Sequence, residues 1–253
     1  ASFVVSSLAS VATSMVIGPF VVPREAAAAT AAAPSFVSPV CRSFARTGTA
    51  GDAALSALSD GGVWYADKNG TRLVRIAPDR SRTPIVPGDA ATGRLSGIAI
   101  GPDSQVWYTK DTANRIGHVP PEGGEGVEFE TPEKHSFPTE LIADRSGQLW
   151  FLASVQHYVG EVGARGAVVV HRGPSAQGRD FTPVGVAVGA DGNLWMTDTG
   201  HNAVYRFDVR SKAFKRFDIP TPQAQPQAIA AAADGNVWFT MFAARKVGRV
   251  TPQ

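Results

Sequence analysis

The sequence predicts an all-β fold, a β-propeller made of four-stranded antiparallel blades, and three observations carry this prediction. All five tryptophans recur at intervals of 43 to 45 residues, at Trp64, Trp107, Trp150, Trp195 and Trp238. A turn signal and then a short apolar run accompany each of them. The 253 residues include 26 Gly and 18 Pro, a composition that favours short strands joined by tight turns.

The first two strands of each unit are expected to form a hairpin around a turn that lies before the tryptophan. Small apolar runs such as SGIAIG, VGVAVG and QAIAAA precede the turn, and runs such as VWYTK and LWMTD follow it. Four residues before each tryptophan stands a turn residue: Asp60, Asp103, Ser146, Asp191 or Asp234. Asp-Gly pairs between apolar runs are typical of tight hairpins. The small residues of the first strand suit the crowded innermost position of a blade.

A third and a fourth strand complete each predicted unit. Apolar pairs recur nine and twelve residues after the tryptophan, at Leu73 and Ile76, Ile116 and Val119, Val159 and Val162, Val204 and Phe207, and Val247 and Val250. A fourth apolar position recurs at Val86, Phe129, Val169 and Phe217. Each unit is therefore expected to be a four-stranded meander with the tryptophan strand packed between neighbouring blades.

Five repeats predict a five-bladed ring that an N-terminal strand closes. The fifth unit lacks an outer strand, and Ser43 to Arg46 lie where such a strand is expected, 20 residues before Trp64. This segment is expected to pair with residues 245–250. The alternative is an incomplete six- or seven-bladed propeller, whose open strand edges would favour association.

The first 40 residues predict an export signal or an anchor followed by an Ala-rich linker, with the propeller domain over residues 41–253. Phe3 to Val22 carry no charge, and Ala26 to Ala33 offer Ala-x-Ala cleavage patterns. We therefore expect a secreted or cell-envelope protein that meets a membrane only through this segment. The single Cys41 excludes an internal disulfide framework. The net charge of +2 does not favour nucleic acid as the main partner.

The repeats resemble those of the streptogramin B (virginiamycin B) lyase family over residues 51–253. The resemblance rests on GIAIGPDSQVWYTKDTANRIGHV in the second unit and WFTMFAARKVGRVTP in the fifth. The fourth unit, PVGVAVGADGNLWMTDTGHNAVYRFD, is equally similar to an NHL repeat. The resemblance implies seven blades and a Mg-assisted lyase that opens the ester linkage of a cyclic depsipeptide. It also implies His residues after the Pro that starts an inner strand, with Glu there and after the Trp strand.

This sequence departs from the implied catalytic pattern. Eleven residues before each tryptophan stand Ala53, Ser96, Thr139, Val184 and Gln227, and none of them is His. Gln227 follows Pro226, and Phe242 follows Met241 where the resemblance implies Glu. A neutral amide does not exchange a proton near neutral pH and does not replace a His base. The sequence therefore favours a scaffold that binds a small molecule, a peptide or a protein.

The predicted binding residues gather where first strands begin and Trp strands end, at the channel mouth. They are Asp67, Ser96, Lys110, Thr139, Glu140, Asp198 and Gln227. Asp67, Glu140 and Asp198 come from three units and are candidate ligands of Mg or Ca. Glu140 and Asp198 are the catalytic candidates of the alternative function, a metal-assisted C–O lyase or lactonase. In the competing interpretation Asp67 and Asp198 are turn acids that accept backbone N–H bonds, and Glu140 is solvated.

Overall fold

The computed structural model describes residues 2–7, 52–57, 61–67, 72–88, 93–176 and 178–251. The chain divides into one compact unit, Ala1–Leu8 with Ala50–Gln253, and a second unit, Ala9–Thr49. The second unit lies outside the described residues, and so do Cys41 and most of the predicted export segment. In the part of the chain that the structure describes, no helix has the length and hydropathy of a membrane span.

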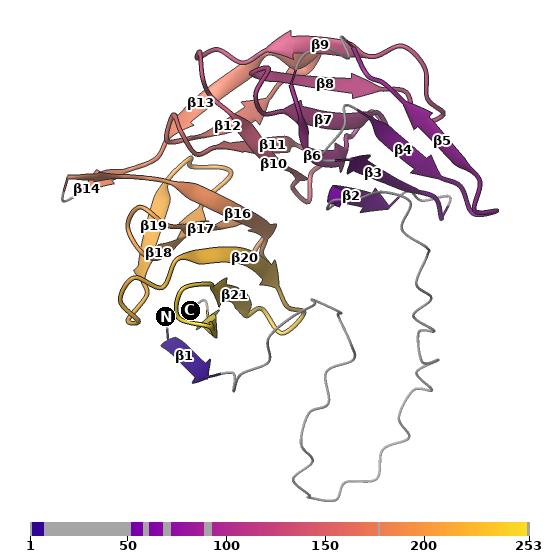
Figure 1. Cartoon of the computed structure of the whole chain (residues 1–253). Helices are drawn as coiled ribbons and strands as arrows, with labels where there is room; N and C mark the ends of the chain where they lie inside the picture. The colour runs from indigo at the N-terminus through magenta and orange to yellow at the C-terminus, as the bar shows by residue number, and fades with distance from the viewer. Residues whose placement is uncertain are drawn as a thin grey trace, which may run out of the picture. The chain divides into compact units, whose positions relative to one another are not determined.

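The described fold is all-β, and its strands form five four-stranded antiparallel sheets, which confirms the predicted repeat (Figure 1). In the first four sheets the strands follow one another in chain order. The first sheet is β2(Asp52–Ala57), β3(Val63–Asp67), β4(Leu73–Ile76) and β5(Arg82–Ile85), and the second is β6(Leu95–Ile100), β7(Val106–Lys110), β8(Arg115–Val119) and β9(Val127–Glu130). The third is β10(Pro138–Ala143), β11(Leu149–Ala153), β12(Tyr158–Val162) and β13(Val168–Arg172), and the fourth is β16(Pro183–Val188), β17(Leu194–Asp198), β18(Ala203–Phe207) and β19(Phe214–Asp218).

The fifth sheet combines the two ends of the chain. Its strands are β20(Pro226–Ala231), β21(Val237–Met241), β22(Lys246–Thr251) and β1(Ser2–Ser7), and β1 pairs antiparallel with β22 from Ser2 opposite Thr251 to Ser7 opposite Lys246. The sequence assigned this edge to residues 43–46, which lie outside the described residues. An N-terminal strand does complete the sheet, but it comes from the beginning of the predicted export segment.

The third unit is longer than the others because it carries an extra hairpin. A short 3-10 turn, η1(Ala164–Gly166), joins β12 to β13. The strands β14(Ser175–Ala176) and β15(Arg179–Asp180) then form a two-stranded sheet between β13 and β16. This hairpin lies in the connection from the third sheet to the fourth.

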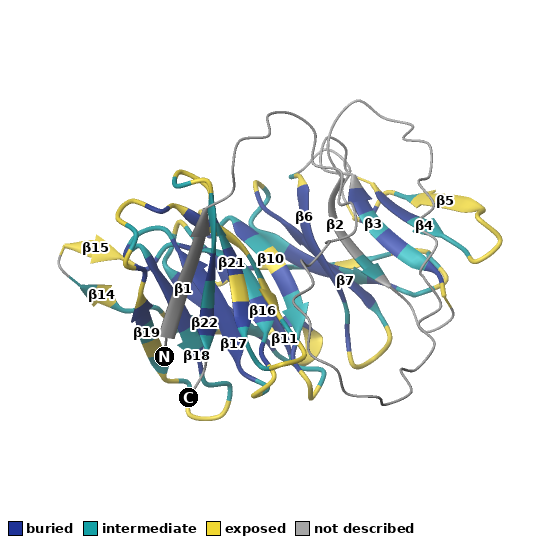
Figure 2. Cartoon of the chain, turned by 90° about the horizontal axis from the view of Figure 1, so that it is seen from below, coloured by how far each residue is buried: buried dark blue, intermediate teal, exposed yellow. Residues whose placement is uncertain are grey.

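The tryptophans of the first four sheets each pack toward the sheet that follows their own. Trp107 lies in one core cluster with Phe151 and Tyr158 of the third sheet, and Trp195 lies in another with Phe239 of the fifth. The exposed fractions are 0% for Trp64, 6% for Trp107, 1% for Trp150 and 0% for Trp195. The second strands β7 and β17 are almost wholly buried, whereas the outer strand β5 is exposed (Figure 2). Trp238 of the fifth sheet is 39% exposed.

Glycine in the first strands allows neighbouring sheets to approach closely, as the sequence predicted. A Cβ atom on Gly97 of β6 would lie 2.5 Å from the carbonyl oxygen of Thr139 in β10. A Cβ atom on Gly185 of β16 would lie 2.5 Å from the carbonyl oxygen of Gln227 in β20. No real Cβ atom tolerates such contacts with backbone. The small residues therefore set the spacing between the innermost strands.

Two of the turn carboxylates before the tryptophans, Asp103 and Asp191, accept a hydrogen bond from the indole of their own sheet. Asp103 accepts hydrogen bonds from the Gln105 amide at 3.1 Å and from Trp107 Nε1 at 3.3 Å. Asp191 likewise accepts a hydrogen bond from Trp195 Nε1 at 3.2 Å. In the third sheet the turn residue is Ser146, and Trp150 Nε1 donates to Asp144 at 3.0 Å instead.

Candidate functional site

The predicted site residues lie at one end of the sheets, where first strands begin and second strands end. We call this the strand-start end. The pairs that define it are Asp52 with Asp67, Leu95 with Lys110, Pro138 with Ala153, Pro183 with Asp198, and Pro226 with Met241. Asp67, Lys110 and Asp198 therefore occupy equivalent positions at the ends of their second strands.

A β-bulge follows the first residue of each first strand. The pairing register shifts between Leu95 and Ile98, and at the equivalent place in the other sheets. The residues in the four longer bulges are Ser96 and Gly97, Thr139 and Glu140, Val184 and Gly185, and Gln227 and Ala228. Bulges re-aim side chains and are common beside functional sites. All seven predicted residues thus lie either in a bulge or directly opposite the residue at which one begins.

Threonines two residues after the tryptophans hold these bulges, a role that the sequence analysis missed. Thr109 Oγ1 accepts a hydrogen bond from the Gly97 amide at 2.7 Å and donates to the Thr139 carbonyl of the next sheet at 2.7 Å. The equivalent contacts are Thr197 with the Gly185 amide and the Gln227 carbonyl, and Thr240 with the Ala228 amide. In the third sheet Leu152 stands at this position. The recurring Trp-x-Thr spacing is the signal that would have revealed this role.

Lys110 is buried in an ion pair and is not a surface residue of the strand-start end. Its ammonium lies 2.6 Å from Glu128 Oε1 and donates to the Pro87 carbonyl at 2.9 Å. Tyr108 Oη also donates to Glu128 Oε1, at 3.1 Å. Burial, and then the Glu128 charge, raise the pKa of Tyr108 well above its usual range. Lys110 therefore stabilises the contact between β7, β9 and the end of the first unit.

Asp198 behaves as the turn acid of the competing interpretation. Its side chain is fully buried. One carboxylate oxygen accepts hydrogen bonds from the Thr182 amide at 2.8 Å and the Gly200 amide at 2.9 Å. The other lies 2.6 Å from His201 Nδ1, and His201 Nε2 lies 3.1 Å from the Arg179 carbonyl. His201 thus lies between the Asp198 carboxylate and the Arg179 carbonyl and links the extra hairpin to the end of β17.

Solvent reaches a different subset of the predicted residues. Glu140 and Gln227 are exposed and Thr139 is half-buried, whereas Ser96 is 8% exposed. Phe242, directly after β21, is 66% exposed. The structure describes the backbone of Asp67 but not its side chain. Among the residues it describes, no group of three or more His, Cys, Asp or Glu side chains is arranged to hold a metal ion.

The repeated sheets, with a tryptophan in each second strand, define a β-propeller protein of the type predicted. This chain belongs to the virginiamycin B lyase family, whose family model matches residues 40–253.

Several proteins similar to this chain are lyases. A virginiamycin B lyase of Nocardia farcinica is 29% identical over 140 residues, which are 55% of this chain and 47% of that protein. The structure of a catalytically inactive virginiamycin B lyase from Staphylococcus aureus with quinupristin is 30% identical, with a TM-score of 0.74 over 80% of this chain and 67% of that one. A streptogramin B lyase structure has a TM-score of 0.71 at 22% identity, covering 79% of this chain and 64% of that one. The chain thus spans about half the length of the curated relative.

Proposed function

We propose that this family member is an exported scaffold that binds a peptide-class ligand at the strand-start end without opening it. The observation that carries the proposal is Gln227, an exposed amide in the bulge of β20. It stands where the resemblance implies a His, and a neutral amide neither accepts nor releases a proton near neutral pH. An amide side chain can still bind a ligand, because it both donates and accepts hydrogen bonds.

The chemistry of the exposed groups supports a peptide-class ligand. Gln227 supplies an amide, Glu140 supplies a carboxylate, and Phe242 supplies a ring that is 66% exposed. Exposed hydrogen-bonding groups and an exposed aromatic ring at one end of a fold are typical of binding sites for peptides and small molecules. Asp198 and Lys110, which are buried and bonded inside the fold, hold the site's framework.

A calorimetric titration with quinupristin tests the binding proposal. The variants Gln227→Ala and Phe242→Ala are compared with Gln105→Ala, which changes a glutamine in the hairpin turn at the other end of the second sheet. We expect Kd to rise about tenfold in Gln227→Ala, since one hydrogen bond in a desolvated site is worth roughly that factor. Gln105→Ala should leave Kd unchanged. Absence of saturable binding, or equal losses in all three variants, contradicts the proposal.

Family membership favours one second candidate, a divalent-metal-dependent lyase or lactonase that opens a cyclic ester. Of the two candidate metal ligands with described side chains, Glu140 is exposed, whereas both Asp198 oxygens already contact protein groups, one of them the Thr182 amide and the other His201 Nδ1. The described residues therefore do not form a complete site for Mg or Ca, and Asp67 and solvent would have to supply further oxygen ligands.

Titration of Mg and Ca into the purified protein separates the two candidates. Binding at unit stoichiometry that Glu140→Ala abolishes and Glu125→Ala preserves supports the enzyme. Glu125 is an exposed carboxylate in the loop before β9 and serves as the matched control. Failure to bind either ion removes the metal-dependent candidate and leaves the binding scaffold.

Export is part of the proposal and rests on the uncharged run from Phe3 to Val22. The same segment begins with β1, which pairs with β22. Cleavage within the Ala-rich run would remove β1 from the mature protein. N-terminal sequencing of the mature chain tests whether the segment is a cleaved signal. A start after residue 26 supports cleavage, whereas a retained Ser2 supports β1 as the outer strand of the fifth sheet in the mature protein.

A further inference from the structure

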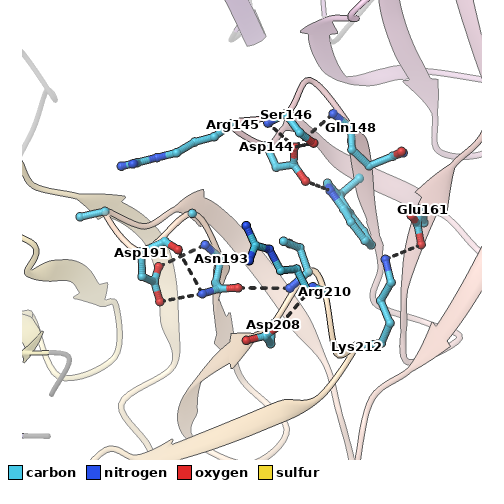
Figure 3. Close-up of a pocket in the computed structure, with 14 residues that line it drawn as sticks. Asp144, Arg145, Ser146, Gln148, Glu161, Asp191, Asn193, Asp208, Arg210 and Lys212 are labelled. Carbon is cyan, nitrogen blue, oxygen red and sulfur yellow. Dashed lines mark hydrogen bonds and ion pairs between the residues drawn. The ribbon is translucent and has the colours of Figure 1, made fainter.

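A cavity of about 600 Å³ opens between the third and fourth sheets, at the end opposite the strand-start end (Figure 3). Three turns frame it: the β10–β11 turn with Asp144, the β16–β17 turn with Asp191, and the β18–β19 turn with Asp208. Trp150 and Glu161 line it from the third sheet. In a meander these turns lie at the end away from the first-strand starts, so the cavity is separate from the site proposed above. Its volume falls in the usual range for small-ligand pockets.

The acidic side chains that line the cavity are already bonded within the protein. Asp144 accepts hydrogen bonds from Ser146, Gln148 and Trp150. Asp191 accepts from Asn193, Trp195 and Arg206, Asp208 accepts from the amides of Arg210 and Ser211, and Glu161 contacts His171 and Lys212. Burial raises the pKa of Asp144, Asp191 and Glu161, but these hydrogen bonds outweigh it, and the pKa of each is lowered.

The Lys212 ammonium is likewise already bound to groups that line the cavity. Its ammonium lies 2.9 Å from Glu161 Oε2 and 4.5 Å from the centre of the Trp150 ring. An ammonium over an indole face is a favourable cation–π contact. The Glu161 carboxylate is thus balanced by a cation fixed in place, and Lys212 closes one side of the cavity.

Two guanidinium groups remain available at the cavity. Arg145 and Arg210 are both exposed, and neither side chain has a hydrogen-bond or ion-pair partner within the described ranges. Arg145 comes from the third sheet, and its Cδ lies 3.7 Å from the place a Cβ atom would take on Gly192 of the fourth sheet. Its side chain therefore passes over the β16–β17 turn. Figure 3 shows Arg145 and Arg210 on two different turns that border the same cavity.

We propose that this cavity is a second binding site, for a small ligand that carries an oxyanion group, either a carboxylate or a phosphate. The guanidinium fork matches the oxygen pairs of both groups and bonds them bidentately. The four carboxylates that line the cavity already accept hydrogen bonds from protein groups. Arg145 and Arg210 are therefore the charged groups at the cavity that are left to bind an oxyanion. The proposal stands whether or not the strand-start end binds a peptide.

Titration calorimetry of the full chain with inorganic phosphate and with succinate, each at matched chloride concentration, tests the proposal. We expect saturable binding of at least one probe. Arg145→Gln and Arg210→Gln should each raise Kd at least about tenfold, because each removes a charge-assisted hydrogen bond. Arg145→Lys should recover only part of the affinity, since it restores the charge without the fork.

Arg165→Gln is the matched control. Arg165 is exposed in η1, at the same end of the third sheet, and does not line the cavity. Binding that persists in Arg165→Gln and is lost in the two cavity variants supports the site, and the probe that binds identifies the oxyanion as phosphate or carboxylate. Absence of saturable binding of both probes, or an equal loss in Arg165→Gln, overturns it. Unchanged Tm values in all variants exclude loss of folding as the cause.

Discussion

Asp198 illustrates how a single buried carboxylate decides between a catalytic and a structural interpretation. Its sequence position, three residues after Trp195, allowed both a metal ligand and a turn acid. The contacts with Thr182, Gly200 and His201 support the turn acid. Lys110 was harder to place from sequence because its partner, Glu128, lies two strands away on β9, a pairing that no local pattern encodes.

We predict that Asp198→Ala destabilises the protein by about 3 kcal/mol or more, because it leaves His201 and two amides without their acceptor in a buried site. Urea unfolding measures the change. Asp180→Ala is the control: that side chain is 56% exposed, and its removal should change stability by less than about 0.5 kcal/mol. Equal effects of the two substitutions would show that the Asp198 contacts do not hold the fold.

The lowered pKa of Asp191 predicts that the folded protein loses stability in acid. Burial raises its pKa, but hydrogen bonds from Arg206, Asn193 and Trp195 dominate and hold the pKa at about 2, below the ordinary 3.8. A lowered pKa stabilises the folded state above the unfolded value, and this stabilisation disappears as pH falls from about 4 to about 2. The side chain is 28% exposed, so solvent screening limits the effect to about 1–2 kcal/mol. Unfolding free energies of the wild type and Asp191→Asn across this range should converge as the pH falls.

The first strands of the second, fourth and fifth sheets combine three local features: a bulge, a glycine or alanine within it, and a threonine contributed by the second strand. The sequence predicted the strand and its small residues because both follow from the 43-residue period. It did not predict the bulge or the threonine, because a register shift of this kind arises from pairing between strands. Thr139, Glu140 and Gln227 therefore reach the strand-start end through a feature that alternation alone does not reveal.

Thr197→Val tests this arrangement at the element scale. The substitution keeps the shape of the side chain and removes a donor to the Gln227 carbonyl and an acceptor for the Gly185 amide. We expect a loss of about 2 kcal/mol, since both groups lie in the contact between the fourth and fifth sheets. Thr83→Val on the exposed strand β5 should be nearly neutral. A neutral Thr197→Val in denaturant unfolding would mean that the bulge does not depend on this hydroxyl.

At the scale of the whole molecule, the first four sheets each bury their tryptophan against the sheet that follows. The repeat period revealed this, since all five tryptophans share one register. The partner of β22 was not predictable, because residues 2–7 and 43–46 are both short candidates and pairing between distant segments depends on the assembled edge. The structure uses β1.

The exposure of the tryptophans predicts unequal contributions to stability. Trp195 is 0% exposed, and Trp195→Ala should lower the free energy of unfolding by about 3–5 kcal/mol, because it opens a large cavity between the fourth and fifth sheets. Trp238 is 39% exposed, and Trp238→Ala should lower the free energy of unfolding by no more than about half of that amount. Denaturant unfolding of the two variants side by side checks this order, and a larger cost for Trp238→Ala would be evidence that its face is covered in solution.

The proposed scaffold function requires that this member of the virginiamycin B lyase family binds its ligand without opening it. The most direct measurement is to incubate the purified protein with quinupristin and Mg, and to separate cyclic from linear peptide by chromatography. We expect the cyclic form to persist while calorimetry on the same sample shows saturable binding. A linear product that forms in proportion to protein and disappears on chelation would contradict it and would establish the metal-dependent lyase.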